Sequence, residues 1–279
     1  MELPELTILS RQMSTEMVGR LISEVEVVNP KCLNMPLEEF QKAIKGRRIQ
    51  AIECRGKWLF VKLDFDGVLL FNPGMGVDMI YFAPRSILPD KYHVRLVLDN
   101  GTGFTIRVWW FCYLHFVPLT KLGEHKFTRG LGTSPFEKDF TFDSFKKLLA
   151  GKRGNIKSFM LDQKNIAGIG NVCIQDILFN AGIHPKRQIN SITHTETEAL
   201  FKSMIDVLNH SIALGGLAYE KDFYGNKGGY GHEQFKIAYK SGEHCPKCDG
   251  IVQKIKTGST SSYICPNCQS LDTRKSTWH

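Results

Sequence analysis

Four cysteines near the end of the printed sequence constrain its folding more than any other feature. They form two CxxC pairs, CPKC and CPNC, separated by the hairpin-like stretch IVQKIKTGSTSSYI: Cys245, Cys248, Cys265 and Cys268. Each pair supplies two thiolates from one tight turn, and two facing turns close a tetrahedral shell around a metal ion. The spacing predicts a ribbon that holds one structural Zn²⁺ per chain, with rubredoxin-type iron or a redox dithiol as the alternatives.

Such a ribbon stabilises a fold and performs no chemistry, because four thiolates leave no open coordination position on the metal. The other four cysteines are scattered in apolar surroundings: Cys32, Cys54, Cys112 and Cys173. In a reducing compartment, clustered thiols favour a metal site over disulfides. Zinc ribbons serve many functions, so this one by itself does not indicate what the protein does.

Length and charge narrow the class of protein. At 279 residues the chain exceeds the usual size of one domain, so two modules, or one module with an appendage, are expected. Lysine and arginine number 36 against 28 acidic residues, and the net charge of +8 suits a polyanionic partner such as nucleic acid. Without an apolar run that could span a membrane, or a signal-peptide pattern, the chain is expected to be cytoplasmic.

The first half of the chain has the pattern of a sheet. Between Ile49 and Val117, runs such as RIQAIECRG, KWLFVKLDF and GVLLFNP are rich in β-branched and aromatic residues and are broken by turn residues. Two helices are expected to pack against this sheet. One covers roughly Leu6 to Ile22, and the other, MPLEEFQKAIKG, begins near Pro36 and stops at Gly46.

The second half has helical periodicity, and the change falls between residues 130 and 140. TFDSFKKLLAG, NVCIQDILFNAG and THTETEALFKSMIDVLNHSIALGG predict helices, with caps at Asp143 and Thr193. LAYEKDFYGNKGGYGHEQF lacks periodicity and predicts a long loop, which in a compact chain is either functional or disordered. His184, in GIHP, is expected to pack or cap at a helix end.

A glycine-rich turn, AGIGN, lies at the centre of the stretch SFMLDQKNIAGIGNVCIQDILFNAGIHP and leads into a helix. Backbone N–H groups at such a helix start can bind phosphate, although many such turns serve only tight packing. In its full length the stretch resembles the helix-two-turn-helix signature of the formamidopyrimidine-DNA glycosylase and endonuclease VIII family. Four other pieces resemble that family in the family's order: ELPEL its catalytic segment, RGKWLFVKL its lysine-bearing hairpin, PGMG its intercalating loop and YICPNCQ its zinc-finger exit.

The resemblance implies an α+β fold in consecutive parts. An N-terminal β-sandwich catalytic domain with flanking helices would cover residues 1–132, a helix-two-turn-helix DNA-binding domain 133–238, and a four-cysteine zinc finger 239–272, with a tail over 273–279. It also implies a base-excision-repair DNA glycosylase with abasic-site lyase activity. We expect a monomer, associated with the nucleoid, that acts on double-stranded DNA containing a damaged base or an abasic site.

The resemblance further implies that the N-terminal amine attacks the anomeric carbon of the sugar. Because Glu2 is too large for the removal of an initiator methionine, Met1 is expected to remain and to supply this amine. An α-amine is less basic than a lysine, so more of it can form a Schiff base at neutral pH. Glu2 is expected to move protons at the opening sugar ring, and Lys57 to contact a phosphate or relay a proton.

The DNA-binding residues that the resemblance implies are a helix-opening wedge, an aromatic group and several phosphate contacts: Met75, Trp109, Trp110, Phe111, Lys157, Asn171 and Thr260. Three of them stand where the family has other residues. RVWWFCY keeps Phe111, but its two tryptophans replace an arginine loop, and Thr260 replaces a phosphate-binding arginine. Most of VWWFCYLHF is expected to be sheet core, with one aromatic exposed. Asn72 stands at the position of a histidine.

Met1 stands where the family has a proline. A proline amine yields a permanently cationic iminium, whereas a primary amine yields an imine that must be protonated to act as the same electron sink. These departures leave two alternatives open. The chain could bind damaged or abasic DNA without excising bases, or it could act on single strands or crosslinks, with Trp109 and Trp110 as a stacking platform.

Overall fold

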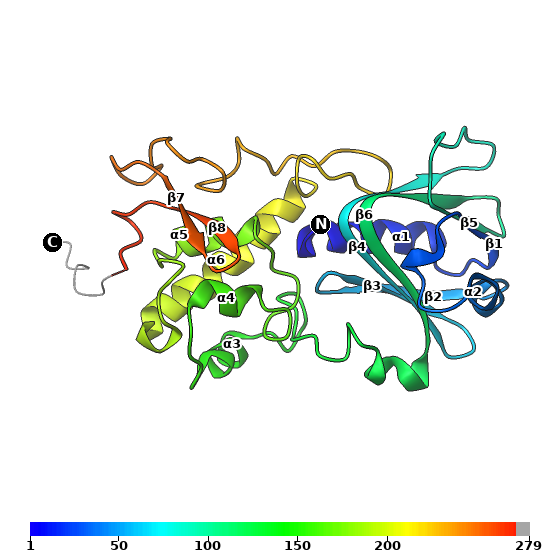
Figure 1. Cartoon of the computed structure of the whole chain (residues 1–279), viewed down its shortest axis with the longest axis horizontal. Helices are drawn as coiled ribbons and strands as arrows, with labels where there is room; N and C mark the ends of the chain where they lie inside the picture. Colours follow the sequence, from blue (N-terminus) through cyan, green and yellow to red (C-terminus); the bar gives the residue numbers. More distant parts are fainter. Residues whose placement is uncertain (272–279) are drawn as a thin grey trace. The chain divides into compact units, whose positions relative to one another are not determined.

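The structure is a computed structural model, which describes residues 1–271 (Figure 1). The chain forms two compact units: a sheet unit from Met1–Gly130 with Ile212–Gly229, and a helical unit from Leu131–Ser211 with the chain from Tyr230 onward. Residues 212–229, here called the return segment, therefore belong with the N-terminal part of the chain. The predicted tail over 273–279 lies outside the described residues, and the division into consecutive domains stays a prediction.

The sheet unit contains one antiparallel sheet in the order β1-β5-β6-β4-β3-β2. Its strands are β1 Ile22–Val27, β2 Ile49–Arg55, β3 Trp58–Leu63, β4 Gly67–Phe82, β5 Val94–Leu98 and β6 Gly103–Pro118. The two long strands, β4 and β6, run through both halves of the sheet, one half next to β5 and β1 and the other next to β3 and β2. The last part of β4 and the first part of β6 pair beside β5, whereas their other ends pair beside β3. The predicted sheet is confirmed, and β1 is an addition to it.

A β-bulge divides the two halves. The register between β4 and β6 shifts on both sides of Met75, and Gly74 and Gly76 adopt positive φ values of 54° and 69° there. A Cβ atom on Gly74 would lie 2.1 Å from the carbonyl oxygen of Phe111. Only glycine is compatible with both the backbone conformation and this close approach. The bulge therefore depends on the glycines of the PGMG sequence.

The first helix, α1 Leu3–Met17, packs its apolar side into the core formed by both halves of the sheet. Glu2 and Glu5 form a capping box at its start. The expected extension of this helix to Ile22 is wrong, because Val18 is already extended, Gly19 has a φ of 86°, and Ile22 begins β1. The second helix, α2 Leu37–Ile44, follows Pro36 as predicted.

The helical unit contains α3 Phe142–Leu149, α4 Ile156–Leu161, α5 Cys173–Asn180 and most of α6 His194–Ala213. The cap of α3 is Thr141, whose hydroxyl accepts the N–H of Ser144 at 3.2 Å, and not Asp143 as expected. Asp143 lies two residues after the cap, inside the first turn, and pairs with Lys146. Three 3₁₀ helices complete the described helices: η1 Pro30–Cys32, η2 Leu119–Glu124 and η3 Ile189–Ser191.

A hairpin of β7 Gln253–Thr257 and β8 Thr260–Ile264 forms the C-terminal ribbon. The mixed α+β class, with an N-terminal sheet, a helical part and a four-cysteine ribbon, is confirmed. From residue 214 to residue 252 the chain contains neither helix nor strand, which agrees with the predicted long loop. None of the helices within residues 1–271 has the length and apolar character needed to cross a membrane.

Candidate active site and metal centre

The start of α1 brings together the two N-terminal residues expected to be catalytic. The α-amine of Met1 lies 3.1 Å from Oε1 of Glu220, and the two side chains are 2% and 14% exposed. Glu2 is also buried, and its side chain accepts a backbone N–H of the first turn of α1. The amine therefore lies in a partly dehydrated site, paired with a carboxylate that is 219 positions away in the sequence.

Glu5 is a buried carboxylate at this site that sequence reasoning missed. Its two oxygens accept the backbone N–H of Glu2 at 2.7 Å and that of Leu217 at 3.0 Å. Burial raises the pKa of Glu5, and the two backbone hydrogen bonds and the nearby amine oppose this effect. The sequence does contain a signal for this role of Glu5, because ELPEL places Glu5 three positions after Glu2, which is the spacing of a capping box.

The return segment is hydrogen-bonded to α1 and β4 along its length. Lys221 pairs with Asp78 of β4 at 2.7 Å, and Gln12 of α1 donates to Asp222 at 2.9 Å. Gln12 also accepts the N–H of Phe223 at 2.9 Å. These contacts favour a functional loop over the alternative of a disordered surface loop, since they hold the segment beside the N-terminus.

Lys57 lies in the turn between β2 and β3 and is half-buried. Its carbonyl oxygen accepts the side-chain amide of Asn72 at 2.8 Å, and Asn72 in turn accepts the N–H of Gly74 at 2.8 Å. Asn72 therefore joins the lysine-bearing turn to the β-bulge. Met75 pairs with Phe111 through its backbone, but its side chain lies outside the described part of the structure.

Three consecutive aromatic residues are exposed on β6 opposite the bulge. Trp109, Trp110 and Phe111 are 51%, 78% and 46% exposed. The expectation that only one aromatic would be exposed is wrong, because the facing residues of β4 include Gly74 and Gly76, which have no side chains to cover the rings. The guanidinium of Arg107 lies 4.8 Å from the ring centre of Trp109, adding a cation to this aromatic surface.

In the helical unit, Lys157 and Thr260 are brought together by the β7–β8 hairpin. Lys157 is 1% exposed, and its ammonium donates to Thr260 Oγ1 at 3.0 Å, to the Ser261 carbonyl at 2.6 Å and to Ser262 Oγ at 2.9 Å. Burial lowers the pKa of Lys157 to about 8. Because the three protons of the ammonium are directed to the hairpin, this lysine fixes the hairpin to α4.

Asn171 lies against the same hairpin. Gln175 of α5 donates to Asn171 Oδ1 and to the Ser261 carbonyl, both at 3.2 Å, and accepts the N–H of Tyr263 at 3.0 Å. Gln175 was missed by sequence reasoning, although a polar residue inside the apolar run CIQDILFN is an available signal. Three predicted DNA-binding residues, Lys157, Asn171 and Thr260, are thus gathered around one turn of the ribbon.

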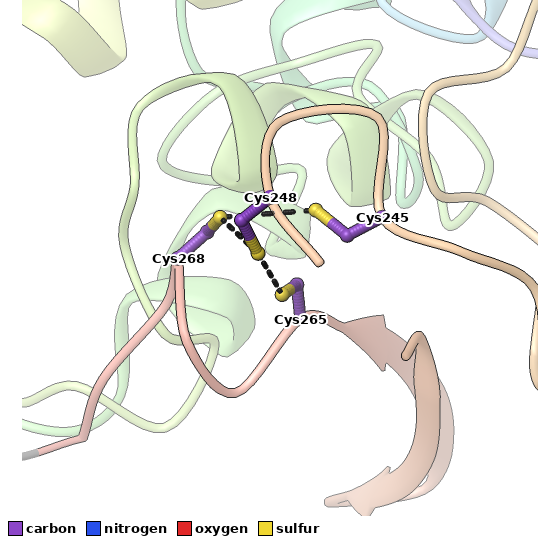
Figure 2. Close-up of side chains that lie close together, drawn as sticks. All are labelled: Cys245, Cys248, Cys265 and Cys268. Atoms are coloured by element: carbon purple, nitrogen blue, oxygen red, sulfur yellow. Dashed lines mark hydrogen bonds between the residues drawn. The ribbon is translucent and has the colours of Figure 1, made fainter. Parts of the chain in front are cut away.

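The four clustered cysteines lie as the spacing predicts (Figure 2). Their sulfur atoms lie within 4.8 Å of one another, with three closest pairs at 3.5 to 3.7 Å. A tetrahedral Zn²⁺ with Zn–S bonds of about 2.3 Å places its sulfurs about 3.8 Å apart, so the donor set fits this ion. The Gly250 N–H lowers the pKa of Cys248 to about 7, which favours the thiolate that a metal requires.

His184 has a packing role, as expected. It is buried, and its Nδ1 accepts the N–H of Lys186 at 3.1 Å in the turn that follows α5. Burial lowers the pKa of His184, and the charges of Lys186 and Arg187 lower it further. The neutral imidazole is therefore a cap for this turn.

Three family models match the chain. The formamidopyrimidine-DNA glycosylase N-terminal domain matches residues 1–107, the H2TH domain of the same enzymes matches 131–222, and a zinc finger found in FPG and IleRS matches 242–271. The formamidopyrimidine-DNA glycosylase of Streptococcus pneumoniae R6 is 31% identical over 277 residues, which is 97% of this chain and 99% of that protein. The one from Photobacterium profundum is 32% identical over 96% of this chain and 99% of its own length.

Solved structures of the Fpg protein of Lactococcus lactis have the same fold. A complex with DNA that contains an abasic site has a TM-score of 0.86 and 26% identity, covering 97% of this chain and all of that one. A complex with FAPY-dG-containing DNA gives the same TM-score and identity over 96% of this chain.

Proposed function

This chain belongs to the formamidopyrimidine-DNA glycosylase family, and we propose that it is a base-excision-repair DNA glycosylase that also cleaves abasic sites by β-elimination. The observation that carries this proposal is the partly buried α-amine of Met1, which is paired with the carboxylate of Glu220 next to the buried residue Glu2. The substrate is double-stranded DNA with a damaged base or an abasic site. The DNA complexes of the similar Lactococcus lactis protein support this substrate class.

The reaction begins when the damaged nucleotide leaves the helix, at a cost of roughly a few kcal/mol that is smallest for a weakened base pair. The Met1 amine attacks the anomeric carbon as the bond to the base breaks, and Glu2 donates a proton to the ring oxygen of the opening sugar. The product is a Schiff base, from which loss of the 3′ phosphate gives strand cleavage. Lys57 contacts a phosphate or relays a proton at this stage.

The residues that we assign to DNA binding are the β-bulge residue Met75, three exposed aromatic residues of β6 and three residues near the ribbon hairpin: Met75, Trp109, Trp110, Phe111, Lys157, Asn171 and Thr260. The exposed aromatic rings stack on bases or fill the space of the flipped nucleotide. Lys157 acts through the hairpin that it holds, while Asn171 and the hairpin itself present polar groups to phosphate. The net charge of +8 supports binding to a polyanion.

Three further assignments accompany this function. One Zn²⁺ per chain, bound by the four clustered cysteines, holds the ribbon closed. The chain works as a monomer in the cytoplasm, in association with the nucleoid. Its domains follow the divisions 1–132, 133–238 and 239–272, supported by the ranges of the matching family models.

The test is borohydride trapping on a duplex that contains an abasic site, with Glu2→Gln for comparison. Intact-mass measurement of the untreated protein establishes whether Met1 is its first residue. The expected result is an adduct on the abasic duplex that maps to the α-amine of Met1, together with loss of base excision by Glu2→Gln on a duplex that contains a damaged base. Tight binding to abasic and damaged duplexes without any adduct would instead assign a protein that recognises damage and does not excise it.

A further inference from the structure

We propose that Glu220 is the general acid–base group that exchanges a proton with the Met1 amine. It removes the proton that keeps the amine from attacking, and it then holds the N–H of the protonated imine. This inference rests on the proposed function, since it concerns the same nucleophile. It assigns a specific chemical task to a residue of the return segment, far from Met1 in the sequence.

The first argument is the contact itself. Oε1 of Glu220 accepts a hydrogen bond from the Met1 amine at 3.1 Å, within the range for direct proton transfer. The side chains of both residues are largely withdrawn from solvent, at 2% and 14% exposure. Ion pairs with this little exposure are less screened by water and salt than surface pairs. The ion pair between Met1 and Glu220 therefore places one carboxylate oxygen directly on the candidate nucleophile.

The second argument is that Glu220 is held in place from both sides. Three positions before it, the N–H of Leu217 binds the buried Glu5, and Gly216 packs on the same carboxylate, where a Cβ would approach to 3.0 Å. Directly after it, Lys221 pairs with Asp78 of β4. The segment that presents Glu220 is thus fixed to both α1 and β4, which limits the geometries that its carboxylate can adopt.

The third argument concerns the other charged groups around the amine. The carboxylate of Glu2 caps the first turn of α1, and both oxygens of Glu5 accept backbone N–H groups. The neighbouring cation of the return segment, Lys221, is neutralised by Asp78. Glu2 and Glu5 therefore have structural partners in α1 and the return segment, whereas Glu220 accepts the amine directly.

The proton movements balance. Glu220 carboxylate accepts one proton from the Met1 ammonium, and the free amine adds to the aldehyde carbon of an abasic sugar to form a carbinolamine. The carboxylic acid of Glu220 returns its proton as the C–O bond of the carbinolamine breaks, so that water leaves. The overall change is ammonium plus aldehyde to protonated imine plus water, with Glu220 again ionised and the total charge unchanged.

Because Met1 has a primary amine, its protonated imine needs a hydrogen-bond acceptor such as the Glu220 carboxylate. The protonated imine of Met1 carries an N–H, and it loses its cationic character, and with it the power to promote β-elimination, if that proton leaves. A carboxylate within hydrogen-bond reach favours the protonated form. The iminium of a proline has no N–H and needs no such acceptor. This second task of Glu220, holding the imine N–H, should therefore depend on the presence of a primary amine at position 1.

The experiment is a cycle of four proteins: the natural chain, Glu220→Gln, Met1→Pro, and the double variant. Single-turnover rates of borohydride trapping and of strand cleavage are measured on an abasic-site duplex. Loss of a general acid–base group typically costs about 10² to 10⁴-fold in rate, so Glu220→Gln should slow cleavage on the order of 10²-fold in the Met1 chain. With proline at position 1, Glu220→Gln should still slow trapping, because a proline ammonium must also lose a proton before it attacks. The ratio of strand cleavage to trapping should fall in the Met1 chain but change by less than about threefold in the Met1→Pro chain, because the iminium then lacks an N–H.

Controls separate chemistry from structure. Glu53→Gln alters an exposed carboxylate of β2 that pairs with Lys62, and it should leave both rates unchanged. Glu220→Asp keeps a carboxylate and should recover part of the lost rate, while the affinity for the abasic duplex and the melting temperature match those of the natural chain. If Glu220→Gln fails to fold, the comparison is made with Glu220→Asp in the Met1 and Met1→Pro chains.

Two results would overturn the inference and are distinguishable from failure of the proposed function. An equal fall in the ratio of strand cleavage to trapping with methionine and with proline would remove the imine N–H contact from the role of Glu220 and reduce it to a structural support of the return segment. Unchanged rates in both chains would remove it from the reaction. If the natural chain forms no adduct while Met1→Pro does, the proposed nucleophile itself is wrong, whatever Glu220 does.

Discussion

Asp176 offers a quantitative test of how the helical unit is held together. This residue of α5 is 1% exposed, and its carboxylate accepts four hydrogen bonds. Oδ2 binds the Tyr230 hydroxyl at 3.0 Å and the N–H of Lys236 at 2.9 Å, and Oδ1 binds the N–H groups of Ile237 at 2.9 Å and Ala238 at 3.2 Å. One side chain therefore fixes the chain that leads into the zinc ribbon.

The perturbation is Asp176→Asn, which keeps the shape and replaces Oδ2 with an N–H₂ group. The Tyr230 hydroxyl can rotate to accept from this group, but the N–H of Lys236 cannot, so one backbone hydrogen bond is lost at roughly 1–3 kcal/mol. The two bonds to Oδ1 become neutral and weaken by about 1 kcal/mol together. The neutral asparagine avoids the desolvation cost of a buried carboxylate, and this gain offsets part of the lost hydrogen-bond energy. We expect a net loss of about 1–3 kcal/mol in the free energy of unfolding of the helical unit.

The assay combines thermal unfolding of the zinc-loaded protein with amide hydrogen exchange. A loss of this size lowers the melting temperature of the helical unit by roughly 5–15 °C, and exchange at the amides of Lys236, Ile237 and Ala238 should accelerate. Asp143→Asn is the matched control, because Asp143 is 75% exposed in its pair with Lys146 and should change stability by less than about 0.5 kcal/mol. If Asp176→Asn behaves like this control, the carboxylate does not receive the four hydrogen bonds.

Three further predictions concern the aromatic surface, a buried histidine and the metal. Trp110→Ala should weaken binding to an abasic duplex by about 5- to 150-fold, since stacking contributes roughly 1–3 kcal/mol per base; an effect no larger than that of Phe65→Ala, which removes another exposed ring, would contradict this. Burial, with a smaller effect of His125, lowers the pKa of His115 to about 4. The unfolded chain then takes up the proton first, so stability should fall from about pH 6.5 to pH 4. The melting temperature of His115→Asn should fall less over this range, and parallel curves would refute the reasoning. Cys265→Ser should reduce bound zinc, measured by atomic emission, from one ion per chain to substoichiometric levels; full retention would exclude the four-thiolate site.

Some features of the site were accessible from short stretches of sequence. The CxxC spacing predicted four clustered sulfurs, because each pair is brought together by its own tight turn. The ELPEL segment contains the spacing of a capping box, Glu2 and Glu5, although the helix was expected to start only at about Leu6. Family membership also followed from the order of several short motifs. In each case the interactions involved lie within a few residues or repeat with a fixed period.

Other features required the tertiary structure. Nothing local to LAYEKDFYGNKGG indicates that Glu220 reaches the Met1 amine, 219 positions away. The exposure of Trp109 and Trp110 depends on the glycines that face them across the sheet, and strand pairing sets which residues face each other. Lys157 was expected at a DNA phosphate, but it lies buried with its three protons directed to the hairpin.

The sequence by itself therefore determined most of the large sheet, the clustering of the four cysteines and the family of the chain. The tertiary structure decided which distant group contacts the Met1 amine and which cations are buried. The physical reason is that periodicity and spacing report interactions between neighbours along the chain. The environment of a titratable group, in contrast, is set by burial and by partners that packing brings from elsewhere in the chain.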